Sequence, residues 1–166
     1  NTAQHIAEEC SRATASVLRT IADVTSDWLV MLDSKLRFVF INHGFGGLEP
    51  ARIIGRTLRE FAPRQRNGNV RELAEEALRS GKSCTLEQEF IAPDGVQRCL
   101  ELRIRSVDWV QAGAASERGI VINATDITTR KALGRELLEI AQREQQRMGS
   151  DLHDGLSQDL TGIALM

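Results

Sequence analysis

The sequence predicts an α+β fold in which helices flank an antiparallel sheet. Short apolar runs of strand length are separated by tight turns, and a stretch with helical periodicity lies between the second and the third of these runs. Two further stretches with helical periodicity occupy the two ends of the chain. The predicted order is a helix, two strands, several helices, three strands and a long helix. Strands that follow one another in groups, instead of alternating with helices, are typical of α+β domains with antiparallel sheets.

The first half of the chain begins with an amphipathic pattern. Apolar residues recur every three or four positions from Ala3 to about Val24, which predicts a helix with one apolar face. Two apolar runs, Trp28 to Leu32 and Phe38 to Ile41, flank a turn at Asp33 to Lys35. They are predicted to form a hairpin of two strands.

Loops and helices are predicted to follow the hairpin. The segment from Asn42 to Leu58 is rich in glycine and is expected to hold loops and short helices. Asn69 to Arg79 has helical spacing, and Gly81 is placed to end that helix. The residues of this helix that are expected to point inward are Val70, Leu73, Ala74, Ala77 and Leu78.

The second half is predicted to hold three strands and a long helix. Cys84 to Ile91 and Arg98 to Val107 flank Pro93-Asp94-Gly95, a sequence typical of hairpin turns. Gly119 to Ala124 is predicted to be the last strand, and a helix is expected from about Thr129 to the end of the sequence.

Composition and charge exclude several classes of function. A chain of 166 residues with 42% hydrophobic content has room for one core of ordinary size plus helical extensions. The net charge is -2 and the basic residues are dispersed among acidic ones, so we expect no direct contact with nucleic acid or with a membrane. No apolar run approaches the roughly 20 residues of a membrane span, and the start, NTAQHIAEEC, lacks the features of a signal peptide.

The cysteines indicate a reducing environment. Cys10, Cys84 and Cys99 are odd in number and have no Cys-x-x-Cys spacing, so neither a disulfide framework nor a zinc or iron–sulfur site is expected. We therefore expect a cytoplasmic location, and the presence of membrane spans upstream stays open. The apolar period continues to Met166 with no glycine or proline to end the helix, so we expect the sequence to be part of a longer protein.

A segment near the end of the long helix carries candidate chemistry. His153 and Asp154 are adjacent, beside an apolar stripe of helical period. Asp154 and Gln158 are four residues apart, so on a helix they project from consecutive turns of one face. A neutral imidazole is a good nucleophile near neutral pH, and a carboxylate that holds one ring N–H leaves the other ring nitrogen free to react. By itself, a His-Asp step on a helix is more typical of a solvated surface pair.

The sequence around this pair resembles a known family. EQQRMGSDLHDGLSQDLTGIAL, from Glu144 to Leu165, is similar to the first helix of the dimerisation and phosphotransfer domain of NarL-type sensor histidine kinases. The resemblance implies that His153 is the phosphoacceptor and that Asp154 is the general base for autophosphorylation. It also implies that Gln158, with Asp154, positions water when the kinase dephosphorylates its partner response regulator.

The preceding part of the chain resembles a second family. Its characteristic points are Asn42 after the second strand, Gly55 before a helix, Asp94-Gly95 in a hairpin, and Asp126-Ile127-Thr128 before the last helix. With these points, Val24 to Thr128 is similar to a PAS sensor domain, which implies a five-stranded antiparallel sheet with flanking helices. The resemblance also implies that Asp126 and Thr128 couple the sheet to the exit helix. The alternative is that they act only as a helix cap, which stabilises the first turn by about 1 kcal/mol.

The two resemblances together predict three segments. Residues 1–23 form an N-terminal linker helix, residues 24–128 a PAS sensor domain, and residues 129–166 a signalling helix with the first part of the phosphotransfer domain. They imply a sensor histidine kinase, in which a signal passes from the PAS domain through a coiled coil to His153, and phosphate then passes to a response regulator. ATP and Mg²⁺ belong to a further domain of the parent kinase, so this sequence alone is expected to be inactive.

The kinase resemblance also implies a homodimer, held through the N-terminal and C-terminal helices. A shift of the paired exit helices is expected to alter how His153 meets ATP. The apolar side of the C-terminal helix is expected to consist of Leu133, Leu137, Leu138, Ile140, Ala141 and Met148.

No cofactor is predicted with a specific set of ligands. By the PAS resemblance, covalent flavin photochemistry needs a cysteine just after Gly55, where this sequence has Arg56-Thr57-Leu58-Arg59, so we exclude it. A haem ligand is not expected, because the predicted helix from Asn69 to Ser80 holds no histidine. His43 lies in a glycine-flanked loop and is expected to be a surface residue.

The aromatic residues leave one question open. Packing in the core against the sheet is one interpretation. The other is a pocket for flavin bound without covalent attachment, or for another small apolar ligand. The residues are Trp28, Phe38, Phe40, Phe45, Phe61, Phe90 and Trp109.

Two other functions are compatible with the sequence. In the first, the chain is a non-enzymatic PAS module that dimerises or binds a ligand and is coupled to a different output domain, and His153-Asp154 is only a surface pair. The second is a metal-dependent phosphohydrolase of the His-Asp type, which needs further metal ligands. The other histidines of the sequence are His5 and His43.

Overall fold

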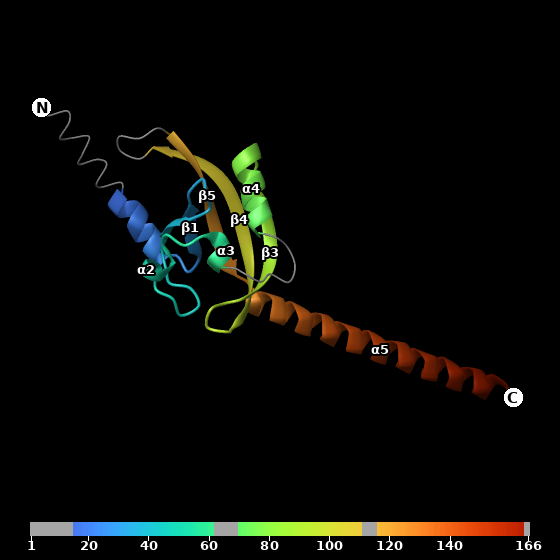
Figure 1. The fold of residues 1–166 in the computed structure, drawn as a ribbon. Helices are drawn as coiled ribbons and strands as arrows, with labels where there is room; N and C mark the ends of the chain where they lie inside the picture. Colours follow the sequence, from blue (N-terminus) through green and yellow to red (C-terminus); the bar gives the residue numbers. More distant parts are fainter. Residues whose placement is uncertain (1–14, 62–69, 111–115, 165–166) are drawn as a thin grey trace, which may run out of the picture. The chain divides into compact units, whose positions relative to one another are not determined.

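The computed structural model describes residues 15–61, 70–110 and 116–164, and it contains a five-stranded sheet (Figure 1). The chain divides into two units, residues 1–127 and residues 128–166. A helix over residues 15–24 precedes the labelled elements. These are β1 (Trp28–Leu32), β2 (Phe38–Ile41), α2 (Pro50–Ile53), α3 (Leu58–Phe61), α4 (Val70–Ser80), β3 (Cys84–Ile91), β4 (Gln97–Val110), β5 (Ser116–Asp126) and α5 (Thr128–Ala164).

The sheet order is β2-β1-β5-β4-β3, so the last strand of the chain lies at the centre of the sheet. β5 pairs in antiparallel fashion with β1 on one side and with β4 on the other. Its side chains Ile120, Ile122 and Ala124 are buried on one face. The predicted α+β class and the five-stranded antiparallel sheet are confirmed.

β4 and β5 are longer than the sequence patterns predict. β4 continues past Val107 to Val110, and β5 begins at Ser116 instead of Gly119. In the added part, Asp108 and Arg118 lie opposite each other, and Nε of Arg118 donates to a carboxylate oxygen of Asp108 at 2.9 Å. Charged pairs of this kind extend the pairing of two strands, but they do not produce the alternation of apolar and polar residues from which strands are predicted. The predicted strands for β4 and β5 are therefore too short.

The N-terminal helix is described only in part. Residues 15–24 are helical, as the spacing predicts, and residues 3–14 of the predicted helix lie outside the described residues. Ala22 is buried in the first unit, whereas Val17, Leu18 and Ile21 are each more than half exposed.

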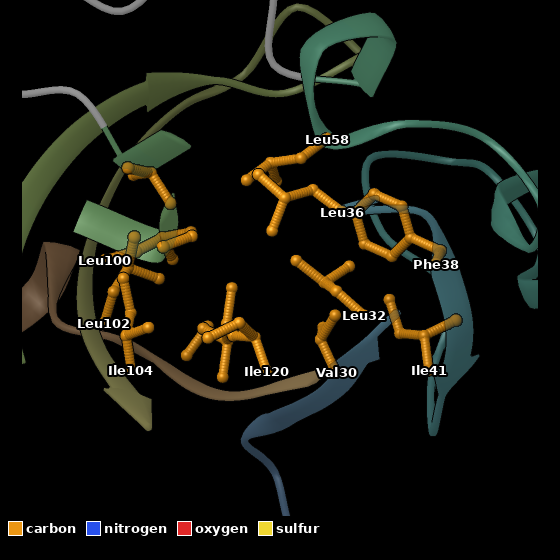
Figure 2. Packing of buried hydrophobic residues seen from close by; sticks show 14 of the residues in the cluster. Val30, Leu32, Leu36, Phe38, Ile41, Leu58, Leu100, Leu102, Ile104 and Ile120 are labelled. Atoms are coloured by element: carbon orange, nitrogen blue, oxygen red, sulfur yellow. The ribbon is translucent and has the colours of Figure 1, made fainter. Parts of the chain in front are cut away.

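One face of the sheet holds the hydrophobic core. Figure 2 shows the labelled side chains from β1, β2, β4 and β5 pointing towards a common interior, with Leu58 of α3 on the opposite side. Leu32, Ile53 and Ile104 are completely buried. Burial of an aliphatic side chain stabilises a fold by about 1.5–3 kcal/mol relative to its exposure, so this shared interior holds the sheet and the helices together.

α4 packs against β4 and β5 on the core side of the sheet (Figure 1). The residues predicted to point inward are buried or half-buried against the core: Val70, Leu73, Ala74, Ala77 and Leu78. The helix ends where the N–H of Gly81 donates to the carbonyl oxygen of Ala77 at 2.9 Å. Gly81 has a φ of +73°, a left-handed conformation that favours glycine, as predicted for the end of this helix.

Asn42, directly after β2, joins the helix of residues 15–24 to the sheet. Its Oδ1 accepts a hydrogen bond from the N–H of Leu29 at 2.8 Å. Its Nδ2 donates to the carbonyl oxygens of Ala22 at 2.7 Å and Asp27 at 2.9 Å. One amide group therefore connects the end of the helix, the link after it and the first strand.

His43, in the loop after β2, is half-buried. Its Nε2 lies 2.8 Å from the carbonyl oxygen of Thr25, and its N–H donates to Oδ1 of Asn42 at 3.0 Å. The link between the N-terminal helix and β1 therefore contacts the loop, and local composition does not reveal this contact between segments.

Candidate functional site

α5 carries the residues that are predicted to do chemistry. It is one helix of 37 residues, and neither Gly134 nor Gly149 interrupts it. It begins at Thr128, one residue earlier than predicted. None of the helices in the described ranges has the length and apolar content of a membrane span.

His153 lies on α5, and its side chain is exposed. Its imidazole is therefore open to contact by another molecule. Asp154 and Gln158 belong to the same helix, and their positions four residues apart share one face of it. The side chains of Asp154 and Gln158 lie outside the described residues.

α5 also exposes a series of large apolar side chains. Exposed apolar residues that gather on one element mark a surface for contact with another molecule. Those that are more than half exposed are Leu133, Leu137, Leu138, Ile140, Met148 and Leu152. All but Leu152 belong to the predicted apolar side of this helix.

The junction before α5 holds the predicted coupling residues. Asp126 is the last residue of β5, and Thr128 is the first residue of α5. A carboxylate oxygen of Asp126 lies 3.8 Å from Nε of Arg98 in β4. The N–H of Ile127 donates to the carbonyl oxygen of Cys99 at 2.8 Å, and the side chain of Ile127 is buried. The end of β5 is thus attached to β4 through both main-chain and side-chain contacts.

Arg98 has two other contacts besides Asp126. Its two Nη atoms donate to the two carboxylate oxygens of Asp94, at 3.3 and 3.0 Å. Its guanidinium carbon lies 5.8 Å from the centre of the Phe45 ring, within the range of a cation–π interaction. The hydrogen bond from Arg98, together with that from the N–H of Val96, holds the pKa of Asp94 below its usual value. Arg98 therefore links the hairpin turn, the end of β5 and an aromatic ring of the core.

Phe45 belongs to an aromatic cluster beside an apolar cavity. Its ring centre lies 5.1 Å from that of Trp28 in an edge-to-face arrangement and 5.2 Å from that of Phe90. The cavity has a volume of about 80 Å³. It is lined by Trp28, Val30, Phe38, Ile41, Phe45, Leu58, Val70, Gln88, Phe90, Leu100, Leu102, Ile122 and Ala124.

Four of the seven aromatic residues fit both predicted interpretations, packing in the core and lining a pocket. Trp28, Phe38, Phe45 and Phe90 pack in or against the core and also line the cavity. Trp109 is half-buried, and its ring lies close to Gly119 of β5. Phe40 is half-buried, and the side chain of Phe61 lies outside the described residues.

Gln88 is the one amide or charged side chain among the residues that line the cavity, and it is only 1% exposed. Its Nε2 donates to the carbonyl oxygen of Glu89 at 2.9 Å, which fixes the orientation of the amide. Its Oε1 has no hydrogen-bond partner in the part of the chain that the structure describes. The other polar atom at the cavity, Nε1 of Trp28, donates to the carbonyl oxygen of Gly44 at 3.0 Å. A buried acceptor without a partner costs about 1–3 kcal/mol, so Gln88 needs an explanation.

Sequence analysis does not identify Gln88 or Arg98. For Gln88 a signal exists in the sequence. Side chains alternate between the two faces of a strand, and Gln88 shares the inward face of β3 with Phe90. A polar residue in an inward position is therefore the signal. For Arg98 no local signal exists. Its partner Asp126 becomes a neighbour only because β4 and β5 pair in this register.

Comparisons with known proteins agree with this fold. A family model described as PAS fold matches residues 22–132. The PAS domain of an HTR-like protein from Haloarcula marismortui has a TM-score of 0.53 and 18% identity, over 74% of this chain and 99% of that one. A comparison with curated proteins found no match.

Two further solved structures share the fold. An RNA-binding light-oxygen-voltage receptor has a TM-score of 0.58 and 19% identity, and the match covers 77% of this chain and 37% of the receptor. A PAS domain from a two-component sensor histidine kinase has a TM-score of 0.52 and 9% identity, over 70% of this chain and 98% of that domain. These structural likenesses show a shared fold. The family model covers more than half of the sequence, so the chain belongs to the PAS fold family.

Proposed function

We propose that this chain is the sensory and phosphoacceptor part of a two-component sensor histidine kinase. The observation that carries the proposal is the exposed His153, followed directly by Asp154, on a helix that begins where the sheet of a PAS domain ends. In this function the PAS domain receives a signal, α5 transmits it, and phosphate passes from His153 to a response regulator.

The residues of α5 have distinct roles in this proposal. One ring nitrogen of His153 attacks the γ-phosphorus of ATP, the bond from this phosphorus to the bridging oxygen breaks, and ADP leaves. Asp154 is the general base that accepts the proton from the other ring nitrogen. In the separate phosphatase reaction, Gln158 and Asp154 position a water molecule that attacks the phosphoryl group of the regulator, which releases inorganic phosphate. ATP and Mg²⁺ are supplied by a domain outside this sequence, so the chain alone is expected to have no kinase activity.

A homodimer is part of this proposal. Leu133, Leu137 and Ile140, all exposed on α5, are spaced by four and three residues, which suits contact with the same helix of a second copy. Paired helices transmit a rotation or a shift along their length, so movement at Asp126 and Thr128 reaches His153 through the dimer. The N-terminal helix, which exposes Val17, Leu18 and Ile21, contributes a second contact.

The test uses the intact kinase that carries this sequence. His153→Gln is expected to abolish phosphate labelling from radioactive ATP. Asp154→Asn is expected to slow labelling by about 10²–10⁴-fold, the usual loss when general base catalysis is removed. Asp151→Asn is the matched control, because Asp151 is exposed on the same helix and has no role in the proposal. Labelling that persists in His153→Gln contradicts the proposal and favours a non-enzymatic PAS module.

A further inference from the structure

A second pocket lies outside the core, between the turn after β1, the start of α3 and one face of α4. Its volume is about 290 Å³, and none of the aromatic rings of the core cavity lines it. Three of its side chains are cationic and one is anionic, so we call it the basic pocket. The polar and charged residues that line it are Ser34, Lys35, Thr57, Arg59, Arg71 and Glu75.

Main-chain contacts and helical spacing build the basic pocket. The N–H of Leu58 donates to the carbonyl oxygen of Leu36 at 2.9 Å, which holds the turn after β1 against the start of α3. Arg71, Glu75 and Leu78 are spaced by four and three residues, so they share one face of α4. Leu36 and Leu58 are buried and Leu78 is half-buried, so the inner wall of the pocket is apolar, whereas its charged residues are exposed.

Two of the three cations of the basic pocket have no counter-ion. In the ranges that the structure describes, the ammonium group of Lys35 and the guanidinium group of Arg59 form no ion pair and no side-chain hydrogen bond. The third cation is partly neutralised, because Nε of Arg71 lies 2.7 Å from a carboxylate oxygen of Glu75. With three cations and one carboxylate, the lining keeps an excess of positive charge that attracts an anion.

Charge and size together indicate the chemical class of this anion. A phosphate monoester carries about -1.5 to -2 charges near pH 7 and has three terminal acceptor oxygens, which suits the excess positive charge of the lining. The hydroxyl group of Thr57 is an additional donor at the pocket. The volume is larger than the cavity of about 150 Å³ that accommodates benzene, so the apolar wall has room for the organic group of an ester.

We propose that the basic pocket binds an organic phosphate monoester, whose phosphate contacts Lys35, Arg59 and Arg71 and whose apolar group packs against Leu36 and Leu58. This site goes beyond the function proposed above, because it lies outside the core of the PAS domain and binding there does not require a phosphoacceptor histidine. Its failure would therefore leave the kinase proposal unchanged, and the reverse also holds.

Three ligands separate the contribution of charge from that of apolar contact. Phenyl phosphate carries both features, inorganic phosphate carries only the charge, and phenol carries only the ring. Each is titrated into the 166-residue chain at constant ionic strength while the amide signals of Lys35, Thr57 and Leu78 are followed by NMR. We expect saturable shifts, with a Kd for phenyl phosphate about tenfold lower than for phenol and about fivefold lower than for inorganic phosphate.

Three variants assign the binding to the basic pocket. Arg59→Gln is expected to raise the Kd for phenyl phosphate about three- to fivefold, the usual effect of losing one exposed ion pair. Arg52→Gln is the matched control, because Arg52 is an exposed arginine of α2 outside the pocket, and its Kd is expected to stay unchanged. Glu75→Gln removes the carboxylate that partly neutralises Arg71, so it is expected to lower the Kd about threefold. Damage to the fold would not tighten binding.

The proposal is overturned by shifts that are linear in phenyl phosphate concentration or confined to residues outside the pocket. It is also overturned if Arg59→Gln and Arg52→Gln change the Kd equally, which would mean attraction to the overall charge of the chain and not to this site. A Kd for inorganic phosphate equal to that for phenyl phosphate would contradict the organic ester, and an equal Kd for phenol would contradict the role of the cations.

Discussion

The Nε atom of Arg98 lies 3.8 Å from a carboxylate oxygen of Asp126, while the guanidinium of the same arginine lies over the ring of Phe45. The ion pair joins the second residue of β4 to the last residue of β5. Because Phe45 also lines the cavity, one side chain contacts both the interior of the PAS domain and the residue that precedes Ile127 and α5.

Arg98→Gln is expected to loosen this junction without unfolding the domain. The side chains of Arg98 and Asp126 are 23% and 37% exposed, and ion pairs of partly exposed groups contribute only up to about 1 kcal/mol. Hydrogen exchange at the N–H of Ile127, which is bonded to Cys99, should become several-fold faster, whereas exchange at Ile120 in the middle of β5 should change little.

Arg118→Gln is the control for this experiment. Arg118 forms an ion pair with Asp108 at the opposite end of the β4–β5 ladder, with both side chains exposed. The control is expected to leave exchange at Ile127 unchanged. Equal exchange at Ile127 in both variants and in the unchanged chain would show that the main-chain bond to Cys99 alone holds the exit of the sheet.

Gly119→Ala is expected to destabilise the domain by about 1–3 kcal/mol, the usual cost of overpacking. A Cβ atom at Gly119 would collide with the ring of Trp109 and with the carbonyl oxygen of Leu32 in the neighbouring strand. Both neighbours belong to the sheet, so relief requires movement of a strand or of the indole. Thermal unfolding measures the loss.

Gly134→Ala is the contrasting change. Nothing lies within 4 Å of a Cβ atom at Gly134 on α5, so alanine meets no steric barrier there. It is expected to increase the helicity of α5, because glycine inside a helix costs about 1 kcal/mol relative to alanine. If both glycine variants lowered the unfolding temperature equally, the close approach of Trp109 to Gly119 would not be the cause.

The residues that could be predicted are those whose role depends on local spacing. The hairpin of β1 and β2, the inward face of α4 and the helical segment around His153 each follow from a period within one segment. The ends of β4 and β5 could not be predicted in this way, because Asp108 and Arg118 stabilise the ladder across two strands.

The same distinction applies to the candidate site. His153 and Asp154 are adjacent in the sequence, so a local pattern is enough to mark them as a candidate pair. The alternation of β3 marks Gln88 as a polar residue in an inward position, but the cavity beside it forms only when the strands pair. Arg98 becomes significant only when Asp94, Phe45 and Asp126 converge on it. Function that depends on contacts between distant segments has no local pattern.

Asn42→Asp is expected to separate the two connections that this residue makes. The carboxylate keeps an acceptor for the N–H of Leu29 but loses both donors to the carbonyl oxygens of Ala22 and Asp27. Loss of two hydrogen bonds is expected to lower the free energy of unfolding by about 2 kcal/mol. Exchange at the N–H of Leu29 should stay slow, while helix 15–24 becomes less protected.

Asn42→Ala provides the comparison, because it removes the acceptor as well. Exchange at the N–H of Leu29 should then become fast, and the unfolding temperature should fall below that of Asn42→Asp. Protection of helix 15–24 that survives in both variants would contradict the assignment of Asn42 as its attachment point.

Stability is expected to depend on pH through Asp94. Hydrogen bonds from Arg98 and from the N–H of Val96 lower the pKa of Asp94 in the folded chain, whereas in the unfolded chain the carboxyl group keeps a value of about 3.9. The charged form of Asp94 therefore favours the folded state above the unfolded pKa, and this contribution is lost as the pH falls through the lower, folded pKa.

Asp94→Asn should accordingly be less stable than the unchanged chain at neutral pH. The difference, measured by urea unfolding, should shrink at pH values below about 4, because the unchanged aspartate also becomes neutral there. A difference that stays constant on acidification would mean that residue 94 acts through the shape of the hairpin turn, since asparagine and protonated aspartic acid carry the same charge.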